Sequence, residues 1–196
     1  VKNFSGRLDD SEIFEGDIRL KLTPELSIET NFNLTLNYNS DSNILVNNIK
    51  NLKSLQDIDF LEAKLSNSIT LNFDKTLKLK RHKYEASGKI VRGTINLRNL
   101  LKNNSLEKKF KKLSLIDSNI KISLNNFKNS SNISGKYKIN DSKTLPFNFE
   151  NKFDNKSVNF KIDANYNQSI NLDFINYFKS DGIDAKILLD FEKQKK

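Results

Sequence analysis

The side chains best suited to catalysis or metal binding are few in this chain. His82 is the only histidine, and it lies between Arg81 and Lys83 with no serine or cysteine patterned to pair with it for nucleophilic catalysis. The acidic pair Asp9-Asp10 falls in a turn-like stretch, where carboxylates normally meet solvent rather than a metal ion. We therefore expect no enzyme activity, no catalytic residue, no cofactor and no metal site.

Composition narrows the alternatives further. Cysteine is absent, which excludes disulfides and thiolate metal sites, and the six glycines are isolated, with no phosphate-cradling loop. No stretch approaches the roughly twenty apolar residues of a transmembrane helix, and no signal-peptide core is present. Because the first residue is Val1 rather than Met, we expect a segment of a longer protein, with any anchor or export signal outside it.

The net charge of +9 does not predict nucleic-acid binding. The excess is almost all lysine, spread over the polar positions, whereas arginine, the usual reader of bases, is sparse. The densest basic run is Lys108-Lys109 with Lys111-Lys112. We interpret this run as a solvated face, with contact to an anionic membrane surface or an acidic partner as the alternative.

The elements that would carry any function show a two-residue alternation of apolar and polar side chains. It is clearest from Leu26 to Tyr38 and recurs over 158–166 and 183–191. A period of two predicts a β-strand with one apolar and one polar face. At about 3.3 Å per residue, the first strand would be roughly 43 Å long, well beyond a usual globular strand.

Turn-forming residues separate the alternating runs and predict a meander. We expect further strands over 14–22, 44–49, 65–73, 77–79, 120–124, 133–139, 145–153 and 170–174. Short loops between them predict sequential antiparallel neighbours. The apolar parity switches between Ile90 and Val91, next to Gly88 and Gly93, which predicts a β-bulge. The range 51–60 loses the alternation, and 99–112 is the best helix candidate.

A sheet with one apolar face can cover it in three ways, and the pattern leaves them open. A second sheet can pack on it, the sheet can close into a barrel, or it can curl into a trough occupied by another apolar molecule. An outer-membrane barrel would carry aromatic girdles at both rims, whereas Phe and Tyr are scattered here. Long strands, few helices and only 36% hydrophobic residues favour the trough over the packed sandwich.

Several segments resemble a known family. Val1-Lys2-Asn3-Phe4-Ser5-Gly6, Ala86-Ser87-Gly88-Lys89-Ile90, Asn132-Ile133-Ser134-Gly135-Lys136-Tyr137 and Asp181-Gly182-Ile183-Asp184-Ala185-Lys186-Ile187 lie among successive long alternating strands. Because of these segments and strands, the chain from Val1 to Phe191 resembles the AsmA-like repeat proteins of Gram-negative envelopes, of the TamB and YhdP type. The resemblance implies a periplasmic protein anchored in the inner membrane, whose curled β-sheets conduct phospholipids toward the outer membrane.

The expected fold class is thus all-β and mainly antiparallel, one long curled sheet forming an open apolar groove over residues 1–196, with at most one or two short helices. Expected partners are phospholipid acyl chains, the membranes at the ends of the full-length protein and other envelope proteins. The competing hypothesis is a β-sandwich or β-meander interaction or adhesion module with a filled core and no ligand. The residues expected to line the groove are Ile18, Leu20, Leu22, Leu26, Ile28, Phe32, Leu34, Leu36, Leu71, Phe73, Ile95, Leu97, Phe147, Phe149, Val158, Phe160, Ile162, Ile170, Leu172, Ile187 and Leu189.

Overall fold

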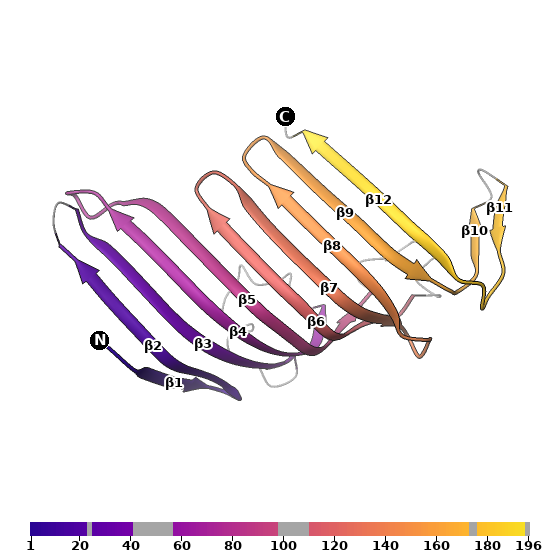
Figure 1. Ribbon diagram of the computed structural model, residues 1–196, viewed down its shortest axis with the longest axis horizontal. Coiled ribbons are helices and arrows are strands. Elements are labelled where there is room, and N and C mark those ends of the chain that lie inside the picture. Colours follow the sequence, from indigo (N-terminus) through magenta and orange to yellow (C-terminus); the bar gives the residue numbers. More distant parts are fainter. Residues whose placement is uncertain (23–24, 41–56, 98–109, 173–175, 195–196) are drawn as a thin grey trace.

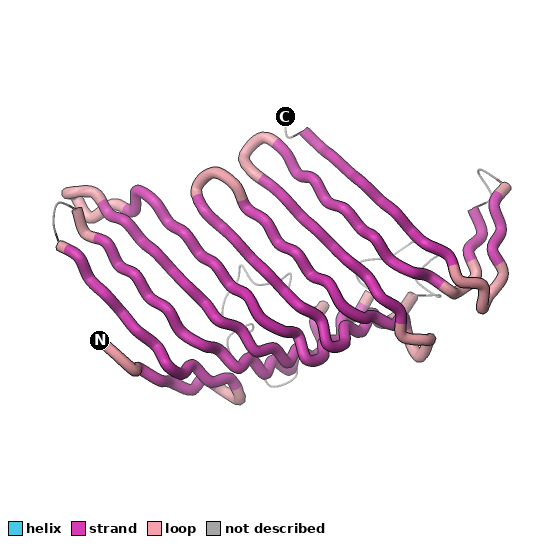
Figure 2. The backbone as a smooth tube through the Cα atoms, in the orientation of Figure 1, coloured by secondary structure: helices cyan, strands magenta, loops and turns pink. Residues whose placement is uncertain are grey.

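The computed structural model describes all residues except 23–24, 41–56, 98–109, 173–175 and 195–196. Among the described residues 76% are in β-strands and none is in a helix. The strands form one large antiparallel sheet and a separate two-stranded sheet (Figures 1 and 2). The predicted all-β, antiparallel class is confirmed.

The strands are long and follow the alternation of the sequence. Their bounds are β1 Phe4–Leu8, β2 Ser11–Lys21, β3 Ser27–Asn39, β4 Ile58–Phe73, β5 Leu79–Asn96, β6 Lys112–Asn125, β7 Asn129–Ile139, β8 Leu145–Phe153, β9 Ser157–Tyr166, β10 Ile170–Leu172, β11 Tyr177–Lys179 and β12 Ala185–Gln194. The predicted long strand from Leu26 to Tyr38 is confirmed as β3, one residue shifted. Its period-two pattern can bury only one face, and so fixes its register against both neighbours.

The ten-stranded sheet has the order β1-β2-β3-β4-β5-β6-β7-β8-β9-β12, and every neighbouring pair is antiparallel. The edge strands β1 and β12 do not pair with each other, so the sheet stays open. β12 pairs with β9, and the hairpin of β10 and β11 stands apart at one end of the molecule (Figure 1). The expectation that all strands pair in chain order is therefore wrong at this end.

The sheet is curled rather than flat, and bulges lie where it bends. In Figures 1 and 2 the lower parts of the central strands turn back behind the sheet. The register slips at Glu15 and Gly16 near the centre of β2, and at Val91 in β5 and Asp117 in β6, both in the lower half of their strands. A bulge adds a residue on one strand and so bends and twists it. The bulge predicted from the parity switch at Ile90 and Val91 is confirmed.

Three local predictions lie mainly outside the described residues. The expected strand over 44–49 lies outside the described residues. Residues 51–56 of the expected irregular stretch and 99–109 of the helix candidate also lie outside them. The described ends of these ranges are extended: Ile58 begins β4 and Lys112 begins β6. The last residue of the predicted helix is thus a strand residue, because its side chain belongs to the alternation of β6.

Candidate functional site: the apolar face of the curled sheet

Apolar side chains form a continuous row across nine of the ten strands. From β2 to β12, one residue of each strand lies directly opposite one residue of the neighbouring strand. Directly opposed residues lie on the same face of a sheet. The row is Ile13, Leu34, Leu65, Gly88, Ile120, Ile133, Phe149, Ile162 and Leu189. Eight of these nine residues have apolar side chains and the ninth, Gly88, has none, so no polar side chain interrupts the row.

The buried residues of the large sheet gather beside this row on the same face. The central cluster is Ala63, Ile90, Leu115, Tyr137, Leu145 and Ala164, with Leu36, Leu65, Ile120, Ile133, Phe147 and Ile162 among the half-buried residues packed against it. In the described part of the chain no helix lies on this face, and the two-stranded sheet of β10 and β11 reaches it at the end of β9, where Lys179 Nζ lies 5.5 Å from the centre of the Tyr166 ring. The described strands therefore do not form the sandwich of two packed large sheets that belonged to the competing hypothesis.

Two tyrosines on this face donate hydrogen bonds from their hydroxyls to acceptors within the protein. The Tyr137 hydroxyl donates to the Asn165 carbonyl at 2.8 Å, and the Tyr84 hydroxyl donates to Asn67 Oδ1 at 2.9 Å. Burial raises the pKa of both phenols above the ordinary value, so both remain protonated donors at neutral pH. Their polar atoms are thereby satisfied, and the rings contribute apolar surface.

Fifteen of the predicted lining residues lie on the apolar face within strands, with Phe73 at the end of β4. The register places these fifteen on one face: Ile18, Leu20, Ile28, Phe32, Leu34, Leu36, Leu71, Ile95, Phe147, Phe149, Val158, Phe160, Ile162, Ile187 and Leu189. Leu22, Leu26 and Leu97 lie just beyond strand ends. Whether these side chains contact a lipid remains a prediction.

Two predicted lining residues are misplaced. Ile170 and Leu172 lie in β10, which pairs only with β11 and is not part of the ten-stranded sheet. Alternation over three residues cannot show which sheet a short strand joins, because any hairpin satisfies it. Conversely Leu65, Ile120 and Ile133 belong to the central row although they were not predicted, and the same parity could have found them.

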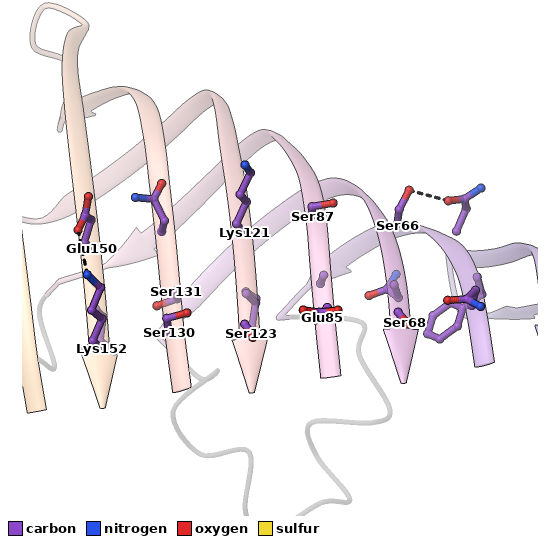
Figure 3. Close-up of a pocket in the computed structure, with 18 of the residues that line it drawn as sticks. Ser66, Ser68, Glu85, Ser87, Lys121, Ser123, Ser130, Ser131, Glu150 and Lys152 are labelled. Atoms are coloured by element: carbon purple, nitrogen blue, oxygen red, sulfur yellow. Dashed lines mark hydrogen bonds and ion pairs between the residues drawn. The ribbon is translucent and has the colours of Figure 1, made fainter. Parts of the chain in front are cut away.

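A cavity of about 820 Å³ opens on the opposite, polar face (Figure 3). Two polar rows on β3 to β8 line it together with Glu15 and with residues of the row between them, which include Phe32, Ala86 and Ile122. Ser66 Oγ donates to Asn33 Oδ1 at 2.8 Å, and Asn33 Nδ2 donates to Glu15 Oε2 at 2.7 Å. Of the predicted lining residues only Phe32 takes part in this cavity.

The rest of the polar face is a ladder of cross-strand ion pairs. Lys161 Nζ lies 2.8 Å from Asp190 Oδ2, and Lys186 Nζ lies 3.0 Å from Asp163 Oδ2. The hydrogen bond from Lys161 lowers the pKa of the Asp190 carboxyl. Because both members of each pair are exposed, solvent screens their attraction, so the pairs fix register and solubilise this face more than they stabilise it.

The residues first considered for chemistry are dispersed in the structure. His82 is exposed on β5, where its backbone N–H donates to Asn126 Oδ1 at 2.7 Å. Asp9 and Asp10 form the turn between β1 and β2. Within the described ranges no three acidic or histidine side chains gather closely enough to hold a metal ion, and no helix could span a membrane.

Comparison with known proteins identifies no relative of this chain. No protein-family model, no curated protein and no solved structure matches the chain. The functional interpretation therefore depends on the apolar face itself, together with the resemblance in the strand and turn segments.

Proposed function

We propose that this chain is a segment of a bridge-like periplasmic protein that conducts phospholipids between the inner and outer membranes, with acyl chains held on the apolar face of the sheet. The observation that supports this most is the row from Ile13 to Leu189, which crosses nine strands of a single-layered, curled sheet. The role is binding and conduction rather than catalysis.

The dimensions of the row suit an acyl chain. Neighbouring strands lie about 4.8 Å apart, so a row through nine strands spans about 38 Å. One acyl chain spans about 15 Å, half of the roughly 30 Å hydrocarbon core of a bilayer. The row is therefore long enough for more than one chain end to end, and its axis runs across the strands.

The energetics suit sliding rather than tight capture. Each methylene removed from water contributes about 0.8 kcal/mol, and this term has no direction. The lining offers methyl groups and rings, while the tyrosine hydroxyls are already bonded internally. A chain can therefore exchange one set of contacts for the next, with its headgroup left at the open side in water.

The competing function is a β-meander interaction module whose apolar face carries no lipid. The two hypotheses differ in what a charge on the row would do. Leu34 and Phe149 are half-buried, and they are the second and the seventh of the nine residues of the row. If the face is open, a carboxylate placed there can hydrate through the open side. In a closed core it would be buried without a partner, at a cost that can exceed the stability of a domain.

The test combines acyl-chain binding with thermal melting. Purified chain is titrated with a fluorescent fatty-acid analogue, and native mass spectrometry records lipid carried from membranes. We expect Leu34→Asp and Phe149→Asp to melt within a few degrees of the unsubstituted chain. They should bind the probe about tenfold more weakly, since losing contact with two methylenes costs about 1.6 kcal/mol.

Ser87→Asp is the matched control, since Ser87 is exposed on the polar face of β5. It should change neither melting nor probe binding. A chain that never carries lipid and binds no probe contradicts the proposal in favour of the interaction module. So does global unfolding of both apolar-face variants, because that outcome requires a closed core.

A further inference from the structure

Three turns along one rim of the sheet share the same pattern of side-chain-to-backbone hydrogen bonds. The turns joining β4 to β5, β6 to β7 and β8 to β9 all lie at the upper rim in Figure 1. In each, an Asp or Asn side chain accepts backbone N–H groups from residues further along the turn. Asp74 Oδ1 accepts from Thr76 and Lys78, Asn125 Oδ1 accepts from Phe127 and Lys128, and Asp154 Oδ1 accepts from Lys156 and Ser157. These side-chain bonds hold the turns in one conformation.

The first two of these rigid turns project large apolar side chains into solvent. Phe127 is 75% exposed at the tip of the β6–β7 turn, and Leu77 is 69% exposed at the tip of the β4–β5 turn. Leu79 and the β2 end at Leu22 extend the same rim with further exposed leucines. A fold gains nothing internally from such side chains, and a cluster of them on a protein surface marks an interaction site.

Leu77 is also held in an unfavourable backbone conformation. Its φ is 60°, in the left-handed region that glycine or asparagine adopts with least strain. An asparagine here would serve the turn better and would also be more soluble. A strained position that carries an exposed leucine therefore points to a role outside the folded chain.

The charge around these tips is positive. Lys75, Lys78, Lys128 and Lys156 are exposed, and within the described ranges none of them forms an ion pair. The nearby carboxylates of Asp74 and Asp154 point into their turns, where they accept N–H groups. The hydrogen bonds from Thr76 lower the pKa of Asp74, so it stays ionised inside the turn. The outward-facing charge is thus that of the lysines.

We propose that the turn rim, meaning Leu77, Phe127 and the lysines Lys75, Lys78, Lys128 and Lys156, docks onto an anionic lipid bilayer surface. Exposed Leu and Phe side chains insert at the boundary between headgroups and acyl chains, while the lysines contact anionic headgroups. This surface is separate from the apolar face, and the inference stands whether or not that face conducts lipid.

The experiment is co-sedimentation of the purified chain with two kinds of vesicle, phosphatidylcholine alone and phosphatidylcholine mixed with phosphatidylglycerol. We expect binding to the anionic vesicles that weakens as salt rises, and little binding to the neutral ones. The double variant Leu77→Asn, Phe127→Ser should reduce the partition coefficient about tenfold. The fourfold Lys→Gln variant at Lys75, Lys78, Lys128 and Lys156 should abolish the preference for anionic vesicles.

Two controls separate the rim from general effects. Leu188→Ser removes a leucine that is 71% exposed in the middle of β12, away from the rim, and should leave vesicle binding unchanged. Leu77→Asn removes backbone strain, so its melting temperature should not fall. The rim variants should still bind the acyl probe, and Leu34→Asp should still bind vesicles, so failure of one proposal is distinguishable from failure of the other.

Three outcomes would overturn the inference. The chain could fail to bind either vesicle, which would favour a protein partner for the rim. It could bind neutral and anionic vesicles equally. Finally, Leu188→Ser could lose as much binding as the double tip variant, which would show that any exposed leucine suffices.

Discussion

At the scale of single residues, one glycine on the apolar face leaves room for a buried neighbour. Gly135 on β7 lies against Ser118 on β6, which is fully buried and whose hydroxyl donates to the Ile116 carbonyl at 3.1 Å. A Cβ added at Gly135 would lie 2.5 Å from the Ser118 Cα atom. Because that neighbour is backbone in a paired strand, it cannot move aside as a long side chain would.

Gly135→Ala should therefore destabilise the chain by about 1–3 kcal/mol, the usual cost of overpacking. The measurement is the midpoint of urea unfolding followed by circular dichroism. Gly6→Ala is the matched control on β1, since an added Cβ there meets nothing within 4 Å. An equal effect of the two substitutions would show that loss of glycine, rather than the contact with Ser118, sets the cost.

At the scale of elements, two of the three bulges in the curled sheet contain a residue with positive φ. Glu15 in β2 has φ of 53° and Asp117 in β6 has φ of 47°. Neither is glycine, so each bulge holds a residue in a conformation that side chains disfavour. Sequence parity predicted only the bulge in β5, because in that strand the apolar positions visibly change parity at Val91.

Replacing Glu15 tests whether this conformation exists in solution. Glu15→Asn keeps a residue that tolerates positive φ, whereas Glu15→Val introduces one that does not. Both lose the acceptor for Asn33 Nδ2. We expect Glu15→Val to be less stable than Glu15→Asn by about 1–2 kcal/mol in urea unfolding. Equal stabilities would mean that β2 pairs with β3 without the bulge.

At the scale of the whole molecule, substantial contacts join only strands that neighbour each other in a sheet. The described sheet therefore resembles a one-dimensional stack, in which each strand is stabilised by its two neighbours and the edge strands by one. β1 is short, and most of β12 is exposed. Stability should thus fall toward both edges rather than being uniform, as it would be around a closed core.

Native-state hydrogen exchange can measure this gradient. We expect the slowest amide exchange in β4, β5 and β6, where long strands have long neighbours on both sides, and progressively faster exchange toward β1 and β12. Edge strands should exchange by local opening that is insensitive to the global unfolding free energy. Uniform protection across all ten strands would instead indicate one cooperative core and would contradict the single-layer description.

Much of the architecture could be predicted because period-two alternation determines both strand and face. That is why β3 could be predicted, and why the residues predicted to share one face, such as Leu34 and Ile162, do share it in the structure. The separate position of Ile170 and Leu172 could not be predicted, since pairing partners of a three-residue strand depend on tertiary contacts. The turn rim was missed for another reason: Leu77 and Phe127 stand out only once their exposure and turn geometry are known.

The sequence by itself determined that this chain is a β-sheet with one apolar and one polar face, because side chains alternate across any strand. It also excluded a thiolate site, since the chain has no cysteine. Only the tertiary structure decided that ten strands form one open layer, that β12 joins β9, and that the apolar row is continuous. Those features depend on register and on bulges, which long-range hydrogen bonding fixes and which local residue types leave undetermined.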